Sequence, residues 1–370
     1  MGSTLLVDGS ATAYRLYDVG YGIDLEHAAE LAGADTRGRS RPARAEARAF
    51  QIRNPPLNVV LGERDLMLAG TARRAIVAAH LYDFGVCSLR ITIDAPSGAS
   101  WSEFVEFGRQ FDTGAEVARL FDAELTTLLA RVALAIERQR IAPVVEDYVV
   151  FRLERLSADA DTRSAAELLT DDHLVPLLLS EKRSLSASAR REMLAHRFSY
   201  YSDDFAVVTW DNALVVEPGA RDYDVEFVVE FANAQLLELR VYDAQLDAEL
   251  PTLYDRIAAA RRRRPLMVRR FSRVISDLQL TIADITEIVE RADNAFKVTD
   301  DVYLARIYAG ALEVFRERAW RSGIDRKLGI LRDTYSMLNA EAQATRAELL
   351  ELAIVVLIIV ELALALARRI

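Results

Sequence analysis

Apolar residues recur at alternating intervals of four and three positions along the C-terminal end of the chain. The repeat covers six heptads, and Thr345 is the only polar residue among its thirteen positions. These positions are Ile324, Leu328, Leu331, Tyr335, Leu338, Ala342, Thr345, Leu349, Leu352, Val356, Ile359, Ala363 and Leu366. A mean spacing of about 3.5 residues places them on one narrow stripe of a helix, as in a coiled coil. We therefore predict one long helix over residues 324–366 that packs against partner helices.

The last part of this predicted helix is apolar on every face, because residues 352–360 read LAIVVLIIV. Such a helix is buried either in protein or in lipid. Residues 349–367 form about 28 Å of helix, close to the ~30 Å hydrocarbon core of a bilayer. However, Glu351 and Glu361 lie off the stripe, and an ionised Glu361 facing lipid would cost about 2.5 kcal/mol or more. The sequence leaves two interpretations open, a membrane-spanning tail anchor and an oligomer core. The candidate residues of this segment are Glu351, Glu361, Leu352, Val356 and Ile359.

Three further helical segments are predicted before the terminal one. The first covers residues 222–260, with a kink at Pro251, which cannot donate to the helical hydrogen-bond ladder. The second opens at Pro265, and the third is capped by Thr299 and ends near residues 322–323. Successive apolar stripes of this kind are typical of an antiparallel helical bundle or coiled-coil stalk.

The first 220 residues mix strand and helix patterns. Strands are predicted over residues 12–19, 57–61, 66–69, 75–82, 86–93, 147–156, 205–210 and 213–216. Helices are predicted over residues 24–31, 102–141, 165–179 and 187–197. Strands that bracket helices in this way favour an α+β class.

The predicted fold class is therefore α+β, a mixed α/β N-terminal region followed by a long-helix bundle or coiled coil that ends in an apolar helix. Four segments make up this prediction. They are a small α/β region at 1–73 with an Arg-rich loop at 34–53, an α+β domain at 74–220, a helical bundle at 221–348, and the apolar helix at 349–367.

The net charge of −10 and the pI near 5.2 argue against a surface that binds nucleic acid as a whole. Cys87 is the only cysteine, so no intramolecular disulfide is possible and a reducing compartment is expected. The N-terminus lacks a charged region followed by an apolar one, and it is not an Arg-rich amphipathic segment. We expect neither a secretory signal nor a transit peptide. The expected location is the membrane, with the bulk of the chain in the cytoplasm.

No catalytic or cofactor motif appears in the sequence. The four histidines lie far apart, and no phosphate-binding loop, nucleophile elbow or zinc-binding helix is present. We therefore predict a non-enzymatic protein with no cofactor, and we infer no small-molecule substrate. Asp203, Asp204, Asp211 and Glu217 flank a predicted hairpin and form a weak candidate for a metal-dependent hydrolase.

A polar stripe interrupts the first long predicted helix. Glu230, Asn233 and Arg240 fall on one face of this helix together with Leu237. Such groups either bind a ligand or fix the register of neighbouring helices, and the structural role is favoured.

Arginines are concentrated at the turn before the second bundle helix. Seven of them fall within thirteen residues: Arg261, Arg262, Arg263, Arg264, Arg269, Arg270 and Arg273. The first interpretation is a solvated charged tip, and the second is a contact with RNA or anionic lipid, as for the Arg-rich loop at 34–53. No aromatic residue interleaves the cluster, so stacking on single-stranded bases is not supported.

Three segments of the C-terminal half resemble the required-for-meiotic-nuclear-division (RMD) family, a family of unknown biochemical activity. They are EFANAQLLELRVYD at 230–243, NAFKVTDDVYLARIY at 294–308, and the run from Arg326 to residue 358. The resemblance covers about 75–370 and implies self-association and membrane association through the last helix. Mitochondrial members are tied to translation in the organelle. The missing presequence favours the bacterial branch.

The sequence thus predicts a non-enzymatic, membrane-tethered homo-oligomeric scaffold that supports translation or membrane organisation. Its expected partners are further copies of itself and a lipid bilayer. The alternative is an RNA- or ribosome-binding protein that uses the arginines between Arg261 and Arg273. A metal-dependent hydrolase is the third hypothesis.

Overall fold

The computed structural model describes most of the chain. The described residues are 5–33, 50–52, 54–158, 164–179, 185–217, 224–262, short segments between 275 and 286, 296–298, and 302–367. They fall into two compact units. The first contains residues 1–241 and 290–318, and the second contains residues 242–289 and 319–370.

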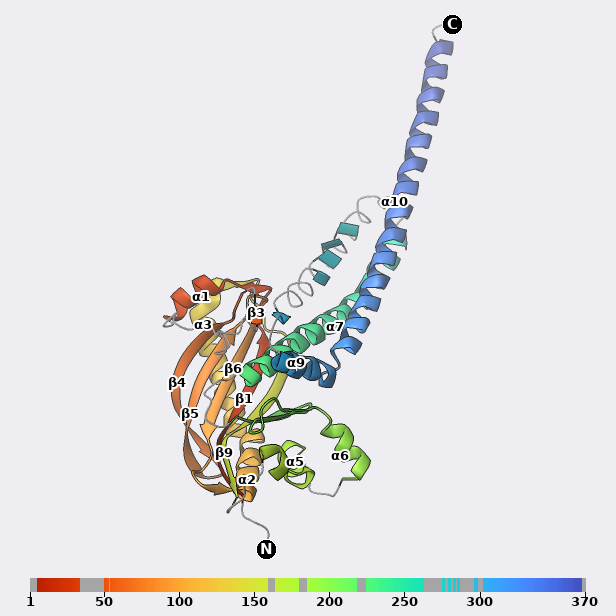
Figure 1. Cartoon of the computed structure of the whole chain (residues 1–370). Helices are drawn as coiled ribbons and strands as arrows, with labels where there is room; N and C mark the ends of the chain where they lie inside the picture. The colour runs from red at the N-terminus through yellow and green to blue at the C-terminus, as the bar shows by residue number, and fades with distance from the viewer. Residues whose placement is uncertain are drawn as a thin grey trace. The chain divides into compact units, whose positions relative to one another are not determined.

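A nine-stranded sheet forms the framework of the first unit. Its order is β10-β11-β12-β9-β1-β6-β5-β4, with β7 added beside β1, and Figure 1 shows its longer strands side by side. The strands are β1 (Leu5–Asp18), β4 (Leu57–Leu68), β5 (Thr71–Leu81), β6 (Val86–Asp94), β7 (Ala99–Ser100), β9 (Val145–Ala158), β10 (Arg197–Phe198), β11 (Phe205–Val208) and β12 (Asn212–Val216). All pairs are antiparallel except β12 with β9.

One strand was predicted as two. The predicted segments 57–61 and 66–69 form the single strand β4, whose pairing with β5 shifts register between Val60 and Gly62. Gly62 has a φ of +104°, which glycine adopts without a Cβ clash. The bulge therefore lets the strand continue through a glycine that the sequence pattern indicated as a break.

Two short ribbons make up the rest of the β structure among the described residues. In one, β2 (Gly22–Ile23) pairs with β8 (Ile136–Glu137), and in the other, β3 (Phe50–Ile52) pairs with β13 (Phe296–Val298).

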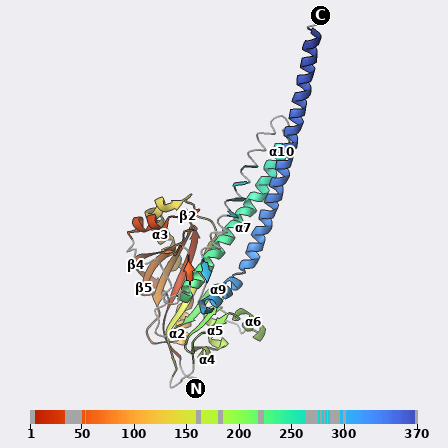
Figure 2. The ribbon, with the colours of Figure 1, turned by 45° about the horizontal axis from the view of Figure 1, so that its top comes forward.

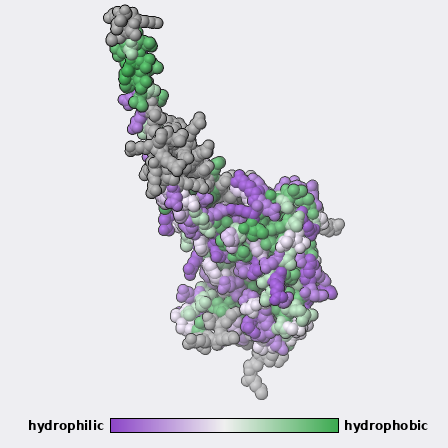
Figure 3. Space-filling view, turned by 180° about the vertical axis from the view of Figure 1, so that it is seen from behind, coloured by the Kyte–Doolittle hydropathy of each residue, from purple (hydrophilic) through white to green (hydrophobic). Residues whose placement is uncertain are grey.

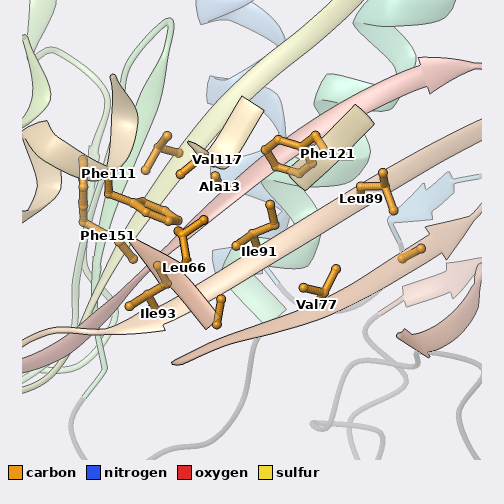
Figure 4. Packing of buried hydrophobic residues seen from close by; sticks show 14 of the residues in the cluster. Ala13, Leu66, Val77, Leu89, Ile91, Ile93, Phe111, Val117, Phe121 and Phe151 are labelled. Carbon is orange, nitrogen blue, oxygen red and sulfur yellow. The ribbon is translucent and has the colours of Figure 1, made fainter. Parts of the chain in front are cut away.

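Helices α2 (Trp101–Asp112) and α3 (Ala115–Val132) cover one face of the sheet. The prediction of one helix over 102–141 was wrong, because the chain breaks at Thr113 and Gly114 and leaves helical structure after Ala135. Figure 4 shows Phe111 and Phe121 from these helices among side chains of the sheet. These rings belong to a large apolar core that includes Leu89 and Ile91 of β6.

Shorter helices lie around this core. They are α1 (Leu25–Ala32), α4 (Ala165–Leu168), α5 (Asp171–Leu178) and α6 (Ala187–Met193), with the 3-10 turn η1 at Ala133–Ala135. Asp24 caps α1 by accepting from the backbone of Glu26 and His27. The predicted helix 165–179 is two helices, since Thr170 leaves the helical conformation and caps α5.

Three long helices carry the C-terminal part: α7 (Asp224–Arg262), α9 (Val302–Val314) and α10 (Glu317–Ala367). The α7 helix continues through Pro251. The predicted end at residues 322–323 was wrong, because the chain turns at Arg316, with a φ of +53°, and α10 runs through Gly323. The predicted cap Thr299 lies outside the described residues. The α+β class is confirmed, with a large N-terminal sheet and C-terminal helices.

The compact units differ from the predicted segments. Strands β1 and β4, from the predicted region 1–73, share one sheet with β5, β6 and β9 from the predicted domain 74–220. The chain also divides inside α7, at residues 241–242, rather than before it.

In the second unit, the C-terminal half of α7 and the first half of α10 run side by side (Figure 2). Lys327 of α10 joins them, because its Nζ lies 2.7 Å from Oδ1 of Asp243 and 2.6 Å from Oδ1 of Asp247. Two carboxylates on successive turns of α7 thus fix the register of α10.

The prediction of a membrane-associated chain with a spanning tail anchor is wrong. Across the residues that the structure describes, no helix is long and apolar enough to cross a bilayer. Glu351 and Glu361 lie within the apolar part of α10 and place carboxylates in the segment that would have to enter lipid.

Candidate functional site: a buried polar layer under α7

The second face of the sheet carries polar side chains although it is also buried. Side chains alternate between the two faces of a strand, so Ser88 and Arg90 of β6 point away from the apolar core that contains Leu89 and Ile91. His80 of β5 and Arg152 of β9 lie on this polar face. The first half of α7 covers them and contributes buried carboxylates.

His80 and Glu230 form the centre of the polar layer. The Nδ1 atom of His80 lies 2.9 Å from both carboxylate oxygens of Glu230, and each side chain is 1% exposed. The rings of Tyr82 and Phe227 contact the imidazole edge-on. Burial lowers the pKa of His80, and the positive charge of Arg90 lowers it further.

Arg152 forms a second buried group with two carboxylates. Its Nη1 lies 2.6 Å from Oε1 of Glu226 on α7 and 3.4 Å from Oε2 of Glu217, which follows β12. The three side chains are 3%, 4% and 8% exposed, so one guanidinium and two carboxyl groups lie together away from water. A helix, a strand and a strand end are thereby joined at one guanidinium.

The predicted polar stripe of α7 contacts two strands. Glu230 binds His80 of β5, and Arg240 forms an ion pair with Glu146 of β9. Asn233 is also buried, at 2% exposure. Burial raises the pKa of Glu146, while the charge of Arg240 opposes this rise. The stripe therefore holds α7 on the sheet.

Sequence reasoning missed His80 and Arg152 as partners of this stripe. A charged residue inside an apolar strand, as in YVVFRL around Arg152, was the available signal. His80 lies 150 positions before Glu230, so no local spacing links the two.

Cys87 is a buried thiol of the apolar core, on the face of β6 that carries Leu89 and Ile91. Burial raises its pKa to about 12, and the negative charge of Glu230 adds to this effect. The thiol is therefore protonated at neutral pH and unreactive. The groups of the polar layer are likewise enclosed between α7 and the sheet.

Two of the four carboxylates proposed for a metal site have separate partners. Asp204 Oδ1 accepts hydrogen bonds from the backbone N–H groups of Tyr200 and Tyr201, while Glu217 binds Arg152. Burial raises the pKa of Asp211. Neither these residues nor any other described group of three or more His, Cys, Asp or Glu is placed to hold a metal ion. The described geometry thus offers no support for the hydrolase hypothesis.

An open cleft of about 300 Å³ lies between the β4–β5 turn and α2. Its walls are Leu68, Thr71, Arg73, Pro96, Ser102, Glu103, Glu106, Phe107 and Gln110. Glu103 completes the capping box of α2 with Ser100, and Glu106 forms an ion pair with Arg109. None of the described residues lining the cleft is a histidine or a cysteine.

The predicted anion-binding arginines are mostly outside the description. Arg261 and Arg262 are the last two residues of α7, whereas Arg263, Arg264, Arg269, Arg270 and Arg273 lie outside the described residues. Of the Arg-rich loop 34–53, the structure describes only residues 50–52, which form β3.

The heptad stripe of α10 is buried in the first part of the helix and exposed to solvent near its end. Ile324, Leu331 and Leu338 are buried, at 1%, 1% and 0% exposure, whereas Leu352 and Ile359 of the same stripe are 61% and 60% exposed. Large apolar side chains are also exposed on the other sides of this segment. They are Leu350, Ile354, Val355, Leu357, Ile358, Val360, Leu362 and Leu364. Figure 3 shows this part of α10 as a hydrophobic surface at the end of the helix.

Comparisons with known proteins identify a family without a described activity. A family model described as "Uncharacterized protein MJ0711, N-terminal domain" matches residues 8–223, more than half of the chain. Uncharacterized protein MJ0711 of Methanocaldococcus jannaschii is 24% identical over 195 residues, which cover 53% of this chain and 59% of that relative. No solved structure matches. These matches confirm a family of unknown function, but neither the RMD family nor a bacterial origin.

Proposed function

This chain belongs to the MJ0711 N-terminal domain family, which has no described activity to transfer, and we propose that it is a non-enzymatic homo-oligomeric scaffold. In this proposal the end of α10 joins copies of the chain, and each copy contributes its sheet-containing unit to the assembly.

The stripe of α10 carries this proposal. It is covered as far as Ala342, at 7% exposure, and continues at Leu352, Val356 and Ile359 with more than half of each residue exposed. An unbroken coiled-coil stripe implies a helical partner along its whole length. Exposed apolar surfaces of this extent mark interaction sites in proteins.

A second copy is the partner that best fits the segment. Residues 352–360 contain no charged or polar side chain, so a partner must present an equally apolar helix of similar length. The terminal segment of another copy meets that requirement, and Glu351 and Glu361 stay off the stripe. The resemblance to the RMD family, whose members self-associate, agrees with this proposal and stays a prediction.

The described polar groups support a non-enzymatic role. His80, Glu230, Arg152 and Glu226 are sealed beneath α7, and each is matched to an opposite or hydrogen-bonding partner. A catalytic acid or base needs access to the atoms of a substrate. In this proposal the buried layer instead stabilises the sheet-containing unit that each copy contributes to the oligomer.

The test is the mass of the full chain in solution, measured by light scattering after gel filtration over a range of concentrations. We expect an oligomer for the wild type and a smaller species for the triple variant Leu352→Glu, Val356→Glu, Ile359→Glu. The exposed positions of these residues imply unchanged far-ultraviolet circular dichroism in the variant. A wild-type chain that is monomeric at the highest attainable concentration would overturn the proposal.

A further inference from the structure

Helix α5 begins with a capping box in which a histidine takes the acceptor position. The backbone N–H of Thr170 donates to Nδ1 of His173, the third residue of the helix, over 3.3 Å, and the Thr170 hydroxyl oxygen lies 2.9 Å from the same nitrogen. Glutamate or glutamine usually fills this position. Glu103 and Glu167 do so at the starts of α2 and α4. Of these three caps, only that of α5 has an acceptor whose ordinary pKa lies near neutral pH.

The hydrogen bond from Thr170 requires a neutral imidazole. An acceptor nitrogen carries a lone pair, so Nδ1 of His173 is unprotonated while the cap is formed. Once protonated, Nδ1 donates to the Thr170 hydroxyl and no longer accepts the N–H, which then faces a second donor. Burial lowers the pKa of His173, and the negative charge of Asp172 opposes this effect. The complete cap is therefore present only in the neutral state.

The charged groups around the imidazole do not compensate for an added proton. Asp171 and Asp172 of the same turn are already paired, with Arg197 of β10 and Arg190 of α6. On the α4 side, the carboxylate of Glu167 caps its own helix. Strand β12, which packs on α5, carries no ionisable side chain. A positive charge in this first turn also meets the positive end of the helix dipole, which is unfavourable.

The first turn of α5 is attached to α2 through Trp101. The indole Nε1 donates to the backbone carbonyl of His173 over 3.3 Å, and the two rings meet edge-on with their centroids 5.8 Å apart. Leu174 and Leu177, which follow in α5, are buried in the apolar core. Figure 1 shows α5 beside α2 and α6. A first turn that opens therefore loses the Trp101 contact and admits water to this part of the core.

We infer that the capping box of α5 is an acid-sensitive switch, in which protonation of His173 opens the first turn of the helix and releases Trp101 while the rest of the sheet-containing unit stays folded. The switch is independent of the proposed self-association through α10. Since the closed cap holds the imidazole neutral, opening begins as the pH falls below the ordinary histidine value of about 6.5, and it reverses as the pH rises again.

Hydrogen exchange of the full chain, followed by mass spectrometry, tests the switch at about pH 7.5 and about pH 5, on either side of the ordinary histidine pKa. The comparison is with His173→Gln, because glutamine fills the same capping position without titrating. The α5 peptide should exchange equally in the two proteins at the higher pH. At the lower pH it should exchange about fivefold faster in the wild type, the usual effect of a lost cap. The ratio between two proteins at one pH cancels the titration of other groups, such as His80.

A second variant and an internal control complete the test. His173→Ala lacks the acceptor at every pH, so its α5 peptide should exchange about fivefold faster than that of His173→Gln at both pH values. Peptides of α3, from the same unit, should exchange equally in the wild type and His173→Gln throughout. A ratio of wild type to His173→Gln that does not change with pH would overturn the switch. An equal change in the α3 peptides, or a His173→Ala variant that exchanges like His173→Gln, would overturn it as well.

Discussion

The buried Arg152 group allows a quantitative test of how α7 is held on the sheet. In an Arg152→Met variant, Glu226 and Glu217 lose the guanidinium that lies 2.6 and 3.4 Å from them while they stay almost completely buried. Removing one partner of a buried ion pair costs about 3–5 kcal/mol, because an uncompensated charge is left away from water. That loss is a large fraction of the ~5–15 kcal/mol that stabilises a typical domain.

Urea unfolding followed by circular dichroism measures this loss. With an m-value of about 3 kcal/mol per M, the unfolding midpoint of Arg152→Met should fall by about 1–1.7 M. Arg155→Met is the matched control, since Arg155 lies on the same strand, is 75% exposed and is 3.7 Å from Asp8. Its midpoint should change by less than about 0.3 M, because exposed ion pairs contribute about 0–1 kcal/mol.

A double variant, Arg152→Met with Glu226→Gln, separates charge from shape. Neutralising Glu226 removes one of the two stranded carboxylates, so the double variant should be more stable than Arg152→Met alone. If Arg152→Met unfolds at the same urea concentration as the Arg155→Met control, the reasoning about the buried charge is refuted.

Three further predictions concern single side chains. Burial depresses the pKa of His80 below 6.5, so the unfolded chain binds a proton at this residue first and stability should fall as the pH drops through 6.5 and below. Urea unfolding at a series of pH values should show a weaker fall for His80→Gln, and an equal fall in the two proteins would contradict this reasoning. Cys87, with a pKa of about 12, should react with a thiol reagent only after unfolding, and rapid labelling of the native chain would contradict this. Gly108→Ala places a Cβ 2.7 Å from a phenylalanine ring of β9 and should lower the free energy of unfolding by about 1–3 kcal/mol. Gly329→Ala has open space around it and should raise the free energy of unfolding by about 0.5–1 kcal/mol. Thermal unfolding measures both changes, and equal shifts in the two variants would be inconsistent with this packing.

Local patterns predicted most individual elements because their causes are local. The apolar run in β9, the Asp211–Asn212 turn and the acidic start of α1 each depend on residues within a few positions. The errors arose at glycines, which can either end a helix or strand or lie within it. Gly62 bends a strand without ending it, and Gly323 continues a helix that the sequence indicated would stop.

The sequence predicted the helical residues of the candidate site but not the strand residues that they contact. The helical spacing placed Glu230 and Arg240 on a common face, and the pairing with His80 and Glu146 then depended on which strands lie beneath that face. Periodicity shows which side of a helix or strand is buried, but it does not show which residues that side contacts.

By itself, the sequence determined the heptad stripe of α10, the apolar run at residues 352–360 and the α+β class, since these follow from residue type and spacing. The tertiary structure alone decided that β12 lies parallel to β9, that Arg152 meets Glu226 from 74 residues away, and where the partner of the stripe ends. Such contacts join residues that are distant in the chain, and their geometry exists only once the strands and helices have packed. The end of α10 depends on both, because its residue types make it apolar and the packing of the chain leaves it exposed.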